Sequence, residues 1–262
     1  MEDVIKLYDK KINLEKIEFE ISKLKESVEK DLNAGVLKTI FGLMDITTLN
    51  STDNIEKVKD LCEKINKFPA HFSAIPDVAA ICVYPSLVPA VREYLKAEDV
   101  KIASVAAGFP SSQTFMAIKT VECKMAIDKG ADEIDIVIPV GKMLNKQYKE
   151  VFMDVAVIKE AVKENHVKVI LETGALSPDE IRLASILSME AGADFIKTST
   201  GKMNPAATPE AMYIMTEAIK DFYKKTKIKV GIKPAGGIAT PEDAMLYYKI
   251  VEKNLGKNWL NS

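Results

Sequence analysis

Cysteine and histidine are scarce in this chain of 262 residues. It has three cysteines, Cys62, Cys82 and Cys123, and two histidines, His71 and His166. The cysteines are odd in number and form no CxxC pair, so we expect reduced thiols and no disulfide framework. Two histidines are too few for a histidine-rich zinc or iron centre, and we expect neither a metal nor another cofactor.

Long apolar runs and a strong charge imbalance are also missing. No stretch of about 18 apolar residues occurs, and the first residues, MEDVIKLYDKK, lack the apolar core of a signal peptide. Lysine and arginine number 36 against 38 acidic residues, which gives a net charge of −2. We therefore predict a cytoplasmic protein that binds neither membranes nor nucleic acid.

What the chain does contain is a regular alternation of short β-rich runs and longer amphipathic runs. The predicted strands are 43–48, 79–85, 101–108, 133–139, 168–173, 194–199 and 229–234. The predicted helices are 53–66, 87–96, 114–129, 146–164, 178–190, 208–224 and 241–253. Strict alternation predicts a parallel sheet with crossover helices. Because no GxGxxG motif follows the first strand, an α/β fold of the (β/α)8 TIM barrel type is favoured over a dinucleotide-binding fold.

Several predicted elements begin or end with recognisable signals. Ser177, Thr208 and Thr240 each stand directly before a proline, which is typical of a capping residue followed by the first helical position. Gly130 and Gly192 each follow a predicted helix and open the sequence Gly-Ala-Asp before a strand. The repeated sequence indicates one structural unit used twice.

The two ends of the chain depart from the barrel pattern. We predict an N-terminal helical extension over residues 1–40 and a barrel catalytic domain over 41–262. Apolar residues recur every three or four positions from Leu14 to Leu32, which predicts an amphipathic helix of roughly five turns that covers a barrel face or an oligomer seam. Only seven strands are predicted and an eighth strand is not present, so we expect the barrel domain to be C-terminally incomplete. Either the sequence omits a tail of the native protein, which the cost of two exposed sheet edges favours, or the barrel is a truncated, open form.

Strand alternation predicts which polar side chains face the barrel interior. Asp45 and Thr47 share one face of the first strand, and Glu133 shares a face with Asp135 in the fourth. The predicted inward set is Asp45, Cys82, Asp135, Lys168, Glu172, Lys197 and Lys233. Barrel interiors are ordinarily filled with branched apolar residues, and their catalytic groups come from the carboxyl ends of the strands. The polar cluster therefore predicts an active site.

Lys197 and Lys233 end two neighbouring strands. A single lysine at the end of a strand would more often form a structural ion pair, but two side by side indicate a chemical role. Neighbouring strands lie about 4.8 Å apart. Two ammonium groups about 5 Å apart repel by about 3.3 kcal/mol at an effective dielectric constant of about 20. We therefore expect one lysine to have a pKa near about 8 instead of about 10.4. A lysine with a lowered pKa attacks carbonyl carbons, which predicts Schiff-base chemistry.

The loops after these two strands are candidates for phosphate binding. Gly236 and Gly237 offer backbone N–H groups after the seventh strand, and Thr200 and Lys202 offer a hydroxyl and a cation after the sixth. Each loop alone is a weak signal, because glycine after a strand commonly serves only to make a turn. Together they predict a phosphorylated carbonyl substrate.

These residues together resemble the deoxyribose-phosphate aldolase family, which are class I aldolases on a (β/α)8 barrel. The matching stretches, in family order, are LMDITTLN (43–50), AAICVYP (79–85), GADEIDIVIP (130–139), KVILETG (168–174), GADFIKTSTGK (192–202) and VGIKPAGG (230–237). The resemblance implies reversible cleavage of 2-deoxy-D-ribose 5-phosphate to D-glyceraldehyde 3-phosphate and acetaldehyde. It also implies a further strand after GKNWLN that closes the barrel, and nothing in the sequence corresponds to it.

The resemblance also implies roles for individual residues. Lys197 would form the imine, Lys233 would lower its pKa, and Asp135 would relay a proton together with a water molecule. The residues expected to bind substrate are Asp45, Thr47, Cys82, Lys168, Thr200, Lys202, Gly236 and Gly237.

Other functions stay open from the sequence. One is another lysine-dependent sugar-phosphate aldolase, and a second is a non-catalytic sugar-phosphate-binding remnant left by loss of the eighth strand. A metal-dependent aldolase is disfavoured by the two histidines. The expected partners are the sugar phosphate and acetaldehyde, together with further copies of the chain in a homo-oligomer, for which a dimer is favoured.

Overall fold

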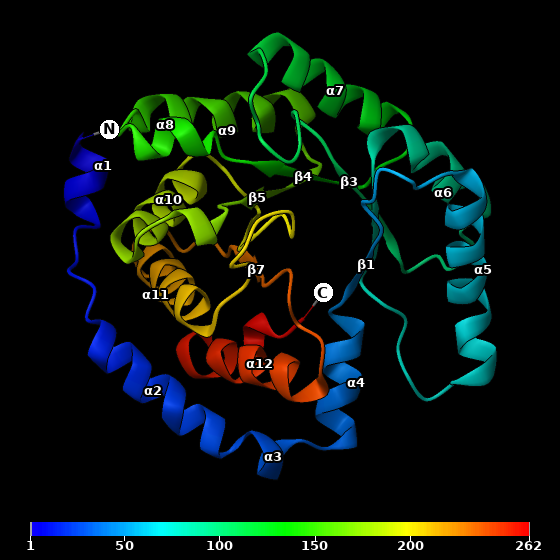
Figure 1. Ribbon diagram of the computed structural model, residues 1–262, viewed down its shortest axis with the longest axis horizontal. Coiled ribbons are helices and arrows are strands. Elements are labelled where there is room, and N and C mark those ends of the chain that lie inside the picture. The colour runs from blue at the N-terminus through cyan, green and yellow to red at the C-terminus, as the bar shows by residue number, and fades with distance from the viewer. Residues whose placement is uncertain (1, 262) are drawn as a thin grey trace.

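The computed structural model describes residues 2–261, and a curled sheet of seven parallel strands forms its centre (Figure 1). The strands are β1 (Asp45–Thr47), β2 (Ala80–Val83), β3 (Lys101–Val105), β4 (Glu133–Val137), β5 (His166–Ile170), β6 (Phe195–Lys197) and β7 (Gly231–Lys233). They pair in chain order, each parallel to the next. This confirms the predicted α/β architecture with seven strands.

Helices surround the sheet on its outer side (Figure 1). They are α5 (Ile55–His71), α6 (Val88–Tyr94), α7 (Met116–Asp128), α8 (Val140–Leu144), α9 (Tyr148–Val162), α10 (Pro178–Glu190), α11 (Pro209–Thr226) and α12 (Pro241–Leu255), with 3-10 turns η1 (Pro85–Leu87), η2 (Thr173–Ala175) and η3 (Lys257–Trp259). Ile134, Ile136 and Ile138, which alternate along the chain with Glu133 and Asp135, belong to the large apolar core that the helices cover. A separate, smaller cluster contains Leu49, Ala80, Cys82, Ala103 and Val105.

The predicted capping residues begin three helices. Ser177 and Glu180 form a capping box at the start of α10, in which each side chain accepts a hydrogen bond from the other residue's backbone N–H. Thr208 caps α11 and Thr240 caps α12, each by accepting from the N–H three residues ahead. The proline after each cap has no N–H to satisfy, so the predicted starts of these helices agree with the structure.

The repeated Gly-Ala-Asp sequence makes the same turn twice. Gly130 and Gly192 follow α7 and α10 with φ of 108° and 95°, a conformation that favours glycine. Asp132 then accepts a backbone hydrogen bond from β3 at 2.8 Å, and Asp194 accepts one from β5 at 2.8 Å. Each aspartate thus ties the start of its own strand to the preceding strand, which helps to fix the register of the sheet.

Residues 2–42 form four helices. They are α1 (Glu2–Leu7), α2 (Leu14–Glu26), α3 (Val28–Asp31) and α4 (Ala34–Gly42). Two of them, α2 and α3, replace the one helix predicted from Leu14 to Leu32. The predicted helix is interrupted at Ser27, whose N–H bonds back to the last turn of α2. Ile17 and Ile21 are the buried residues of α2, which lies along α11 and α12 outside the sheet (Figure 1).

Within residues 2–261, β1 and β7 are the edges of the sheet, and no eighth strand joins them. One polar link crosses this seam between the two edges. Lys233 at the end of β7 donates to the Leu43 carbonyl at 2.9 Å and to Asp45 Oδ1 on β1 at 2.8 Å. Beside the seam, Trp259 Nε1 donates to the Val230 carbonyl at 3.0 Å and so holds η3 against the chain entering β7.

Within residues 2–261, no helix is both long enough and apolar enough to cross a membrane.

Candidate active site

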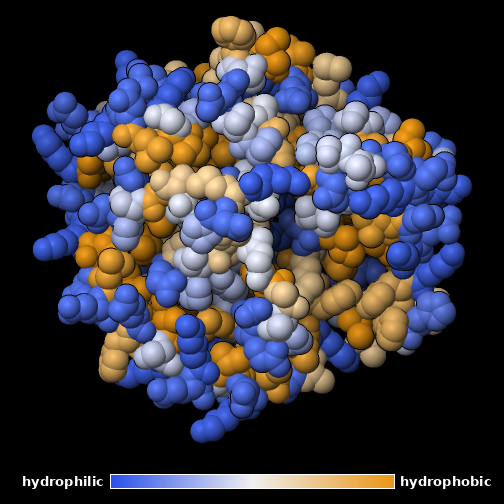
Figure 2. Space-filling model, in the orientation of Figure 1, coloured by the Kyte–Doolittle hydropathy of each residue, from blue (hydrophilic) through white to orange (hydrophobic). Residues whose placement is uncertain are grey.

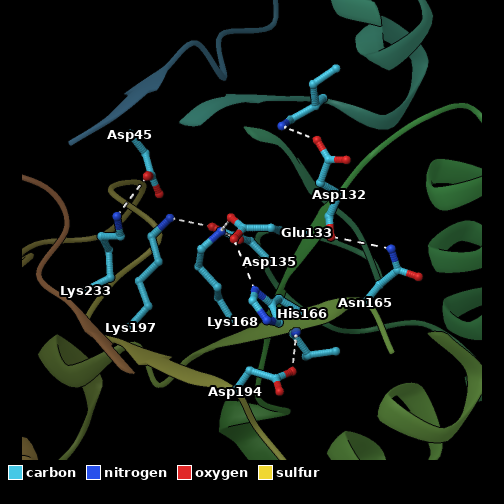
Figure 3. Close-up of polar contacts among 12 residues, drawn as sticks. Asp45, Asp132, Glu133, Asp135, Asn165, His166, Lys168, Asp194, Lys197 and Lys233 are labelled. Atoms are coloured by element: carbon cyan, nitrogen blue, oxygen red, sulfur yellow. Dashed lines mark hydrogen bonds and ion pairs between the residues drawn. The ribbon is translucent and has the colours of Figure 1, made fainter. Parts of the chain in front are cut away.

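The polar residues predicted to face inward meet inside the curled sheet (Figure 3). They are Asp45 from β1, Glu133 and Asp135 from β4, Lys168 from β5, Lys197 from β6 and Lys233 from β7. Asp135 is completely buried, and Lys168 and Lys197 are only 2% and 6% exposed. Ionised groups are expensive to bury without partners, and each of these six contacts a group of opposite charge.

Asp135 lies between two lysines. Its Oδ2 accepts from Lys197 Nζ at 2.6 Å, and its Oδ1 accepts from Lys168 Nζ at 3.1 Å. Lys168 also forms an ion pair with Glu133. Two anions and two cations therefore alternate along the interior, an arrangement in which all four can stay ionised away from water.

Lys197 and Lys233 are register partners on β6 and β7, which agrees with the prediction that they end neighbouring strands side by side. Their ammonium groups nevertheless contact different carboxylates. Lys197 donates to Asp135, whereas Lys233 donates to Asp45 across the seam (Figure 3).

These contacts set the charge state of the predicted nucleophile. Burial lowers the pKa of Lys197, but the charged and polar groups around it, Asp135 foremost, together outweigh burial and raise the pKa above its ordinary value. Burial raises the pKa of Asp135, but Lys168 and Lys197 outweigh it and lower the pKa to about 2. The fall in the pKa of Lys197 expected from Lys233 is therefore not found, because Asp135 stabilises the Lys197 ammonium group and Asp45 forms an ion pair with Lys233.

Burial lowers the pKa of Lys168 as well, and the carboxylates around it, Asp135 first, reverse this and raise the pKa above the ordinary value. Lys168 is thus a permanent cation between β4 and β5.

Thr47 and Cys82 are register partners on β1 and β2. Burial raises the pKa of the Cys82 thiol to about 12, so this side chain is neutral near pH 7. Thr47 is exposed and donates to the carbonyl of Asp45 at 3.3 Å. Cys82 is therefore buried in the smaller apolar cluster, whereas Thr47 beside it on β1 is exposed.

A cavity of about 620 Å³ follows the seam between β7 and β1. Its polar lining includes Asp45, Thr47, Glu133, His166, Lys168, Lys197 and Lys233. Gly236 and Gly237 lie on the same wall, and Tyr247, Tyr248 and Trp259 supply aromatic surface from α12 and η3. Figure 2, in the same orientation as Figure 1, shows a hollow with hydrophilic groups near the middle of this face.

The loop after β6 carries two of the predicted substrate-binding residues. Thr200 donates to both carboxylate oxygens of Glu172, through its hydroxyl at 2.5 Å and its backbone N–H at 3.2 Å. Lys202 donates through Nζ to the carbonyl of Leu49, in the loop after β1. Glu172 lies beyond the end of β5 with φ of 55°, so strand alternation no longer sets its direction, and its carboxylate serves to hold this loop.

The loop after β7 packs on the loop after β6. Gly236 and Gly237 have φ of 84° and 80°. A Cβ at Gly236 would lie 2.7 Å from the Ala206 side chain and 3.4 Å from Gly201 Cα, so this position requires glycine for space as well as for its backbone conformation. The two predicted phosphate-binding loops are therefore in contact, although Thr200 and Lys202 are not among the residues lining the cavity.

Two residues without a predicted role also belong to this cluster. Strand alternation predicted that Glu133 faces the barrel interior, and His166 Nδ1 lies 3.4 Å from Glu133 Oε1.

In residues 2–261 no group of three or more His, Cys, Asp or Glu side chains is arranged to hold a metal ion.

Comparison with known proteins identifies the family. The family described as DeoC/LacD family aldolase matches residues 39–255. The chain is 38% identical over 248 residues to the deoxyribose-phosphate aldolase of Mus musculus, covering 90% of this chain and 78% of that protein. It is 37% identical over 248 residues to the deoxyribose-phosphate aldolase of Homo sapiens, with the same coverage of 90% and 78%.

Solved structures agree on the fold. The tetrameric deoxyribose phosphate aldolase from Aeropyrum pernix superposes with a TM-score of 0.71 at 24% identity, covering 87% of this chain and 89% of that one. A protein described as QR15, an aldolase, gives a TM-score of 0.67 at 27% identity, with coverage of 80% and 87%. Since the family match spans most of the sequence and the relatives exceed 30% identity along most of their length, this chain belongs to the DeoC/LacD family of aldolases.

Proposed function

We propose that the protein is a deoxyribose-phosphate aldolase, which reversibly cleaves 2-deoxy-D-ribose 5-phosphate to D-glyceraldehyde 3-phosphate and acetaldehyde through an imine on Lys197. The observation that carries this proposal is the 2.6 Å contact between Lys197 and Asp135 at the carboxyl end of the sheet, beside a second lysine. The names of the relatives support the choice of substrate.

In the proposed reaction Lys197 first gives a proton to Asp135, a step that the ion pair between them opposes and that the neighbouring charge of Lys233 favours. The neutral amine then forms a C–N bond with the aldehyde carbon, and the carbonyl oxygen takes two protons and leaves as water. Cleavage of the C2–C3 bond sends its electron pair into the iminium group, while the C3 hydroxyl loses its proton and becomes the aldehyde of the three-carbon product. Asp135 accepts the proton of the C3 hydroxyl and returns a proton to C2 of the resulting enamine, and water then hydrolyses the iminium group to free acetaldehyde and the Lys197 amine.

Lys233 would act on the charge of Lys197 after the first proton transfer. Once Asp135 is protonated, it no longer stabilises an ammonium group on Lys197. The Lys233 ammonium group, which donates to Asp45 and the Leu43 carbonyl, would then disfavour reprotonation of its register partner.

Asp45 has a feature that suits substrate binding. Its Oδ1 accepts from Lys233, whereas its Oδ2 is buried and has no hydrogen-bond partner in the described chain. A buried acceptor without a donor is costly, so a hydroxyl of the bound sugar would stabilise the site. We assign Thr47, Cys82 and Lys168 to the same sugar-binding wall.

The phosphate group would bind where the loops after β6 and β7 meet. Lys202 supplies a cation there, Thr200 supplies a hydroxyl, and the glycine turn at Gly236 and Gly237 leaves room for a ligand to approach the backbone. Lys202 would exchange its contact with the Leu49 carbonyl for the phosphate.

We also propose a cytoplasmic homo-oligomer, with a dimer favoured. Phe115, Ile118, Val121 and Met125 are exposed at intervals of three and four residues, so they form an apolar stripe at the start of and along α7. The stripe and the tetrameric structure of the Aeropyrum pernix protein support self-association. The three free, buried cysteines suit a reducing compartment.

Borohydride trapping tests the proposed function. Acetaldehyde with sodium borohydride should leave a stable ethyl group on Lys197, located by peptide mass mapping. A Lys197→Met variant should lose the label, and a Lys129→Met variant, which changes an exposed lysine, should keep it. Labelling of Lys202 or Lys233 instead would overturn the assignment. If Lys197 is labelled but the protein cleaves another sugar phosphate and not deoxyribose phosphate, the proposed substrate would be wrong.

A further inference from the structure

The row of charges in the barrel extends beyond the residues that the proposed reaction uses. Glu133 is the first residue of β4 and lies two positions before Asp135 on the same face (Figure 3). Its side chain is 11% exposed and is ion-paired with Lys168, which is 2% exposed. Glu133 is therefore nearer to the amino ends of the strands than the reacting lysine, and it contacts that lysine only through Lys168 and Asp135.

Charge balance explains why a carboxylate is needed at this position. Lys168 and Lys197 are two buried cations that both bind Asp135. With Asp135 as their only anion, they would compete for one carboxylate and leave a net positive charge away from water. Glu133 supplies the second anion, so each lysine has a carboxylate and Asp135 keeps one oxygen for Lys197.

We propose that Glu133 is a positioning residue of the aldolase site, which acts through Lys168 to hold one carboxylate oxygen of Asp135 in contact with Lys197. This inference rests on the proposed function, because it concerns how Asp135 exchanges protons with the imine-forming lysine.

The other groups that face Glu133 lie at the solvent end of the row. His166 Nδ1 is 3.4 Å from Glu133 Oε1, its side chain is 54% exposed, and its ring packs against Phe195. Asp99 and Lys101 line the same end of the cavity. Because solvent screens these exposed groups, Lys168 remains the one strong partner of Glu133 among them.

The first variant is Glu133→Gln, which keeps the shape of the side chain and removes its charge. Lys168 should then turn fully to Asp135, so the protonated form of Lys197 loses stabilisation while Asp135 becomes a weaker base. We expect the midpoint of the pH profile for labelling Lys197 to fall by about one pH unit. We expect kcat to fall about tenfold or more with KM little changed, since proton transfer by Asp135 is slowed.

The matched variants are Lys168→Met, the double variant Glu133→Gln/Lys168→Met, and Glu133→Asp. The double variant buries no unpaired charge, so its labelling midpoint should stay within about half a pH unit of the wild-type value. Its loss in kcat should be smaller than the product of the two single losses. Glu133→Asp keeps the anion and should retain the wild-type midpoint. A purely structural role would change the melting temperature of these variants without moving the midpoint.

Labelling with formaldehyde and cyanoborohydride measures the amine of Lys197 whatever its natural substrate is, so it separates this inference from the proposed function. A wild-type enzyme that is labelled at Lys197 but cleaves no deoxyribose phosphate would contradict the proposed substrate alone. An unchanged midpoint and kcat in Glu133→Gln would overturn the role of Glu133. If either single variant fails to fold, a displaced midpoint in the folded double variant would overturn it as well.

Discussion

Lys197 and Lys233 stand opposite each other in the register of β6 and β7, yet each ammonium group binds its own carboxylate. The two neighbouring lysines therefore belong to two separate ion pairs, Lys197 with Asp135 and Lys233 with Asp45. These ion pairs offset the repulsion between the two ammonium groups. In the proposed reaction the repulsion becomes effective only when Asp135 has taken the proton of Lys197.

Removing the carboxylate that neutralises Lys233 should expose this repulsion. In an Asp45→Asn variant the Lys233 ammonium group loses its carboxylate partner, and Lys197 also loses the direct stabilisation that Asp45 gives its protonated form. We expect the midpoint for borohydride trapping of Lys197 to move to lower pH by about one unit. Asp179→Asn, at an exposed position of α10, is the control, and a midpoint that moves upward would contradict the prediction.

The opposite change is expected when Lys233 itself is removed. In Lys233→Met no cation remains beside Lys197 after proton transfer, so the apparent pKa of the nucleophile should rise. A rise of about one unit lowers the fraction of neutral amine near pH 7 about tenfold. The pH profile of kcat/KM measures this effect, and an unchanged profile would show that Lys233 has another role.

An Asp135→Asn variant should lose both turnover and stability, each for its own reason. The amide cannot accept a proton, so kcat should fall by about 10²- to 10⁴-fold. Two buried lysines would also lose their shared anion, which should cost about 3–5 kcal/mol in the free energy of unfolding. Urea unfolding and steady-state kinetics on the same preparation measure the two effects. A stable variant with near-normal turnover would remove Asp135 from the mechanism.

The stability of the protein should depend on Asp135 in acid. The pKa of Asp135 is lowered to about 2 in the folded protein, against an ordinary value of 3.8. Because the pKa is lower in the folded protein, the contribution of Asp135 to the free energy of unfolding is fully present above the pKa of the unfolded state. It is lost as the pH falls through the pKa of the folded state. We expect about 2 kcal/mol of the free energy of unfolding to disappear between about pH 4 and about pH 2. Denaturant titrations across this range check it, and Asp135→Asn should lack this part of the pH dependence.

Much of the site was predictable because strand alternation is simple geometry. Asp135, Lys168, Lys197 and Lys233 are inside the barrel because each falls on the inward face of a parallel strand. The inward direction predicted for Glu172 does not follow from alternation, because β5 ends at Ile170 and Glu172 has a left-handed backbone conformation. The rule holds only as long as the strand continues.

The charge state of the lysines was not predictable in the same way. The sequence places Lys197 beside Lys233, but only the folded structure shows which carboxylate each flexible side chain reaches. Asp45 and Asp135 come from strands far apart in the chain, and their contacts reverse the expected direction of the pKa of Lys197. The interruption of the N-terminal helix at Ser27 was missed because apolar periodicity does not take account of the Ser27 hydroxyl, which donates to the Leu24 carbonyl.

Recognition of the phosphate should depend on Lys202 more than catalysis does. Lys202 lies in the loop after β6 and contacts the Leu49 carbonyl, whereas Lys197 is held by Asp135 inside the sheet. A hydrogen bond from a cation to a phosphate contributes about 1.5–3 kcal/mol, which corresponds to about a tenfold to a hundredfold change in affinity. In Lys202→Met we therefore expect KM for 2-deoxyribose 5-phosphate to rise by that factor with kcat little changed.

Unphosphorylated 2-deoxyribose is the internal control for this prediction, because it lacks the group that Lys202 would bind. Its kcat/KM should be nearly the same in Lys202→Met and in the wild type, and Lys129→Met should alter neither substrate. The ratio of kcat/KM for the two substrates is the quantity to measure. Equal losses on both sugars would mean that Lys202 acts on the shape of the loop through Leu49. Loss on the phosphorylated sugar alone places the phosphate at the junction of the loops after β6 and β7.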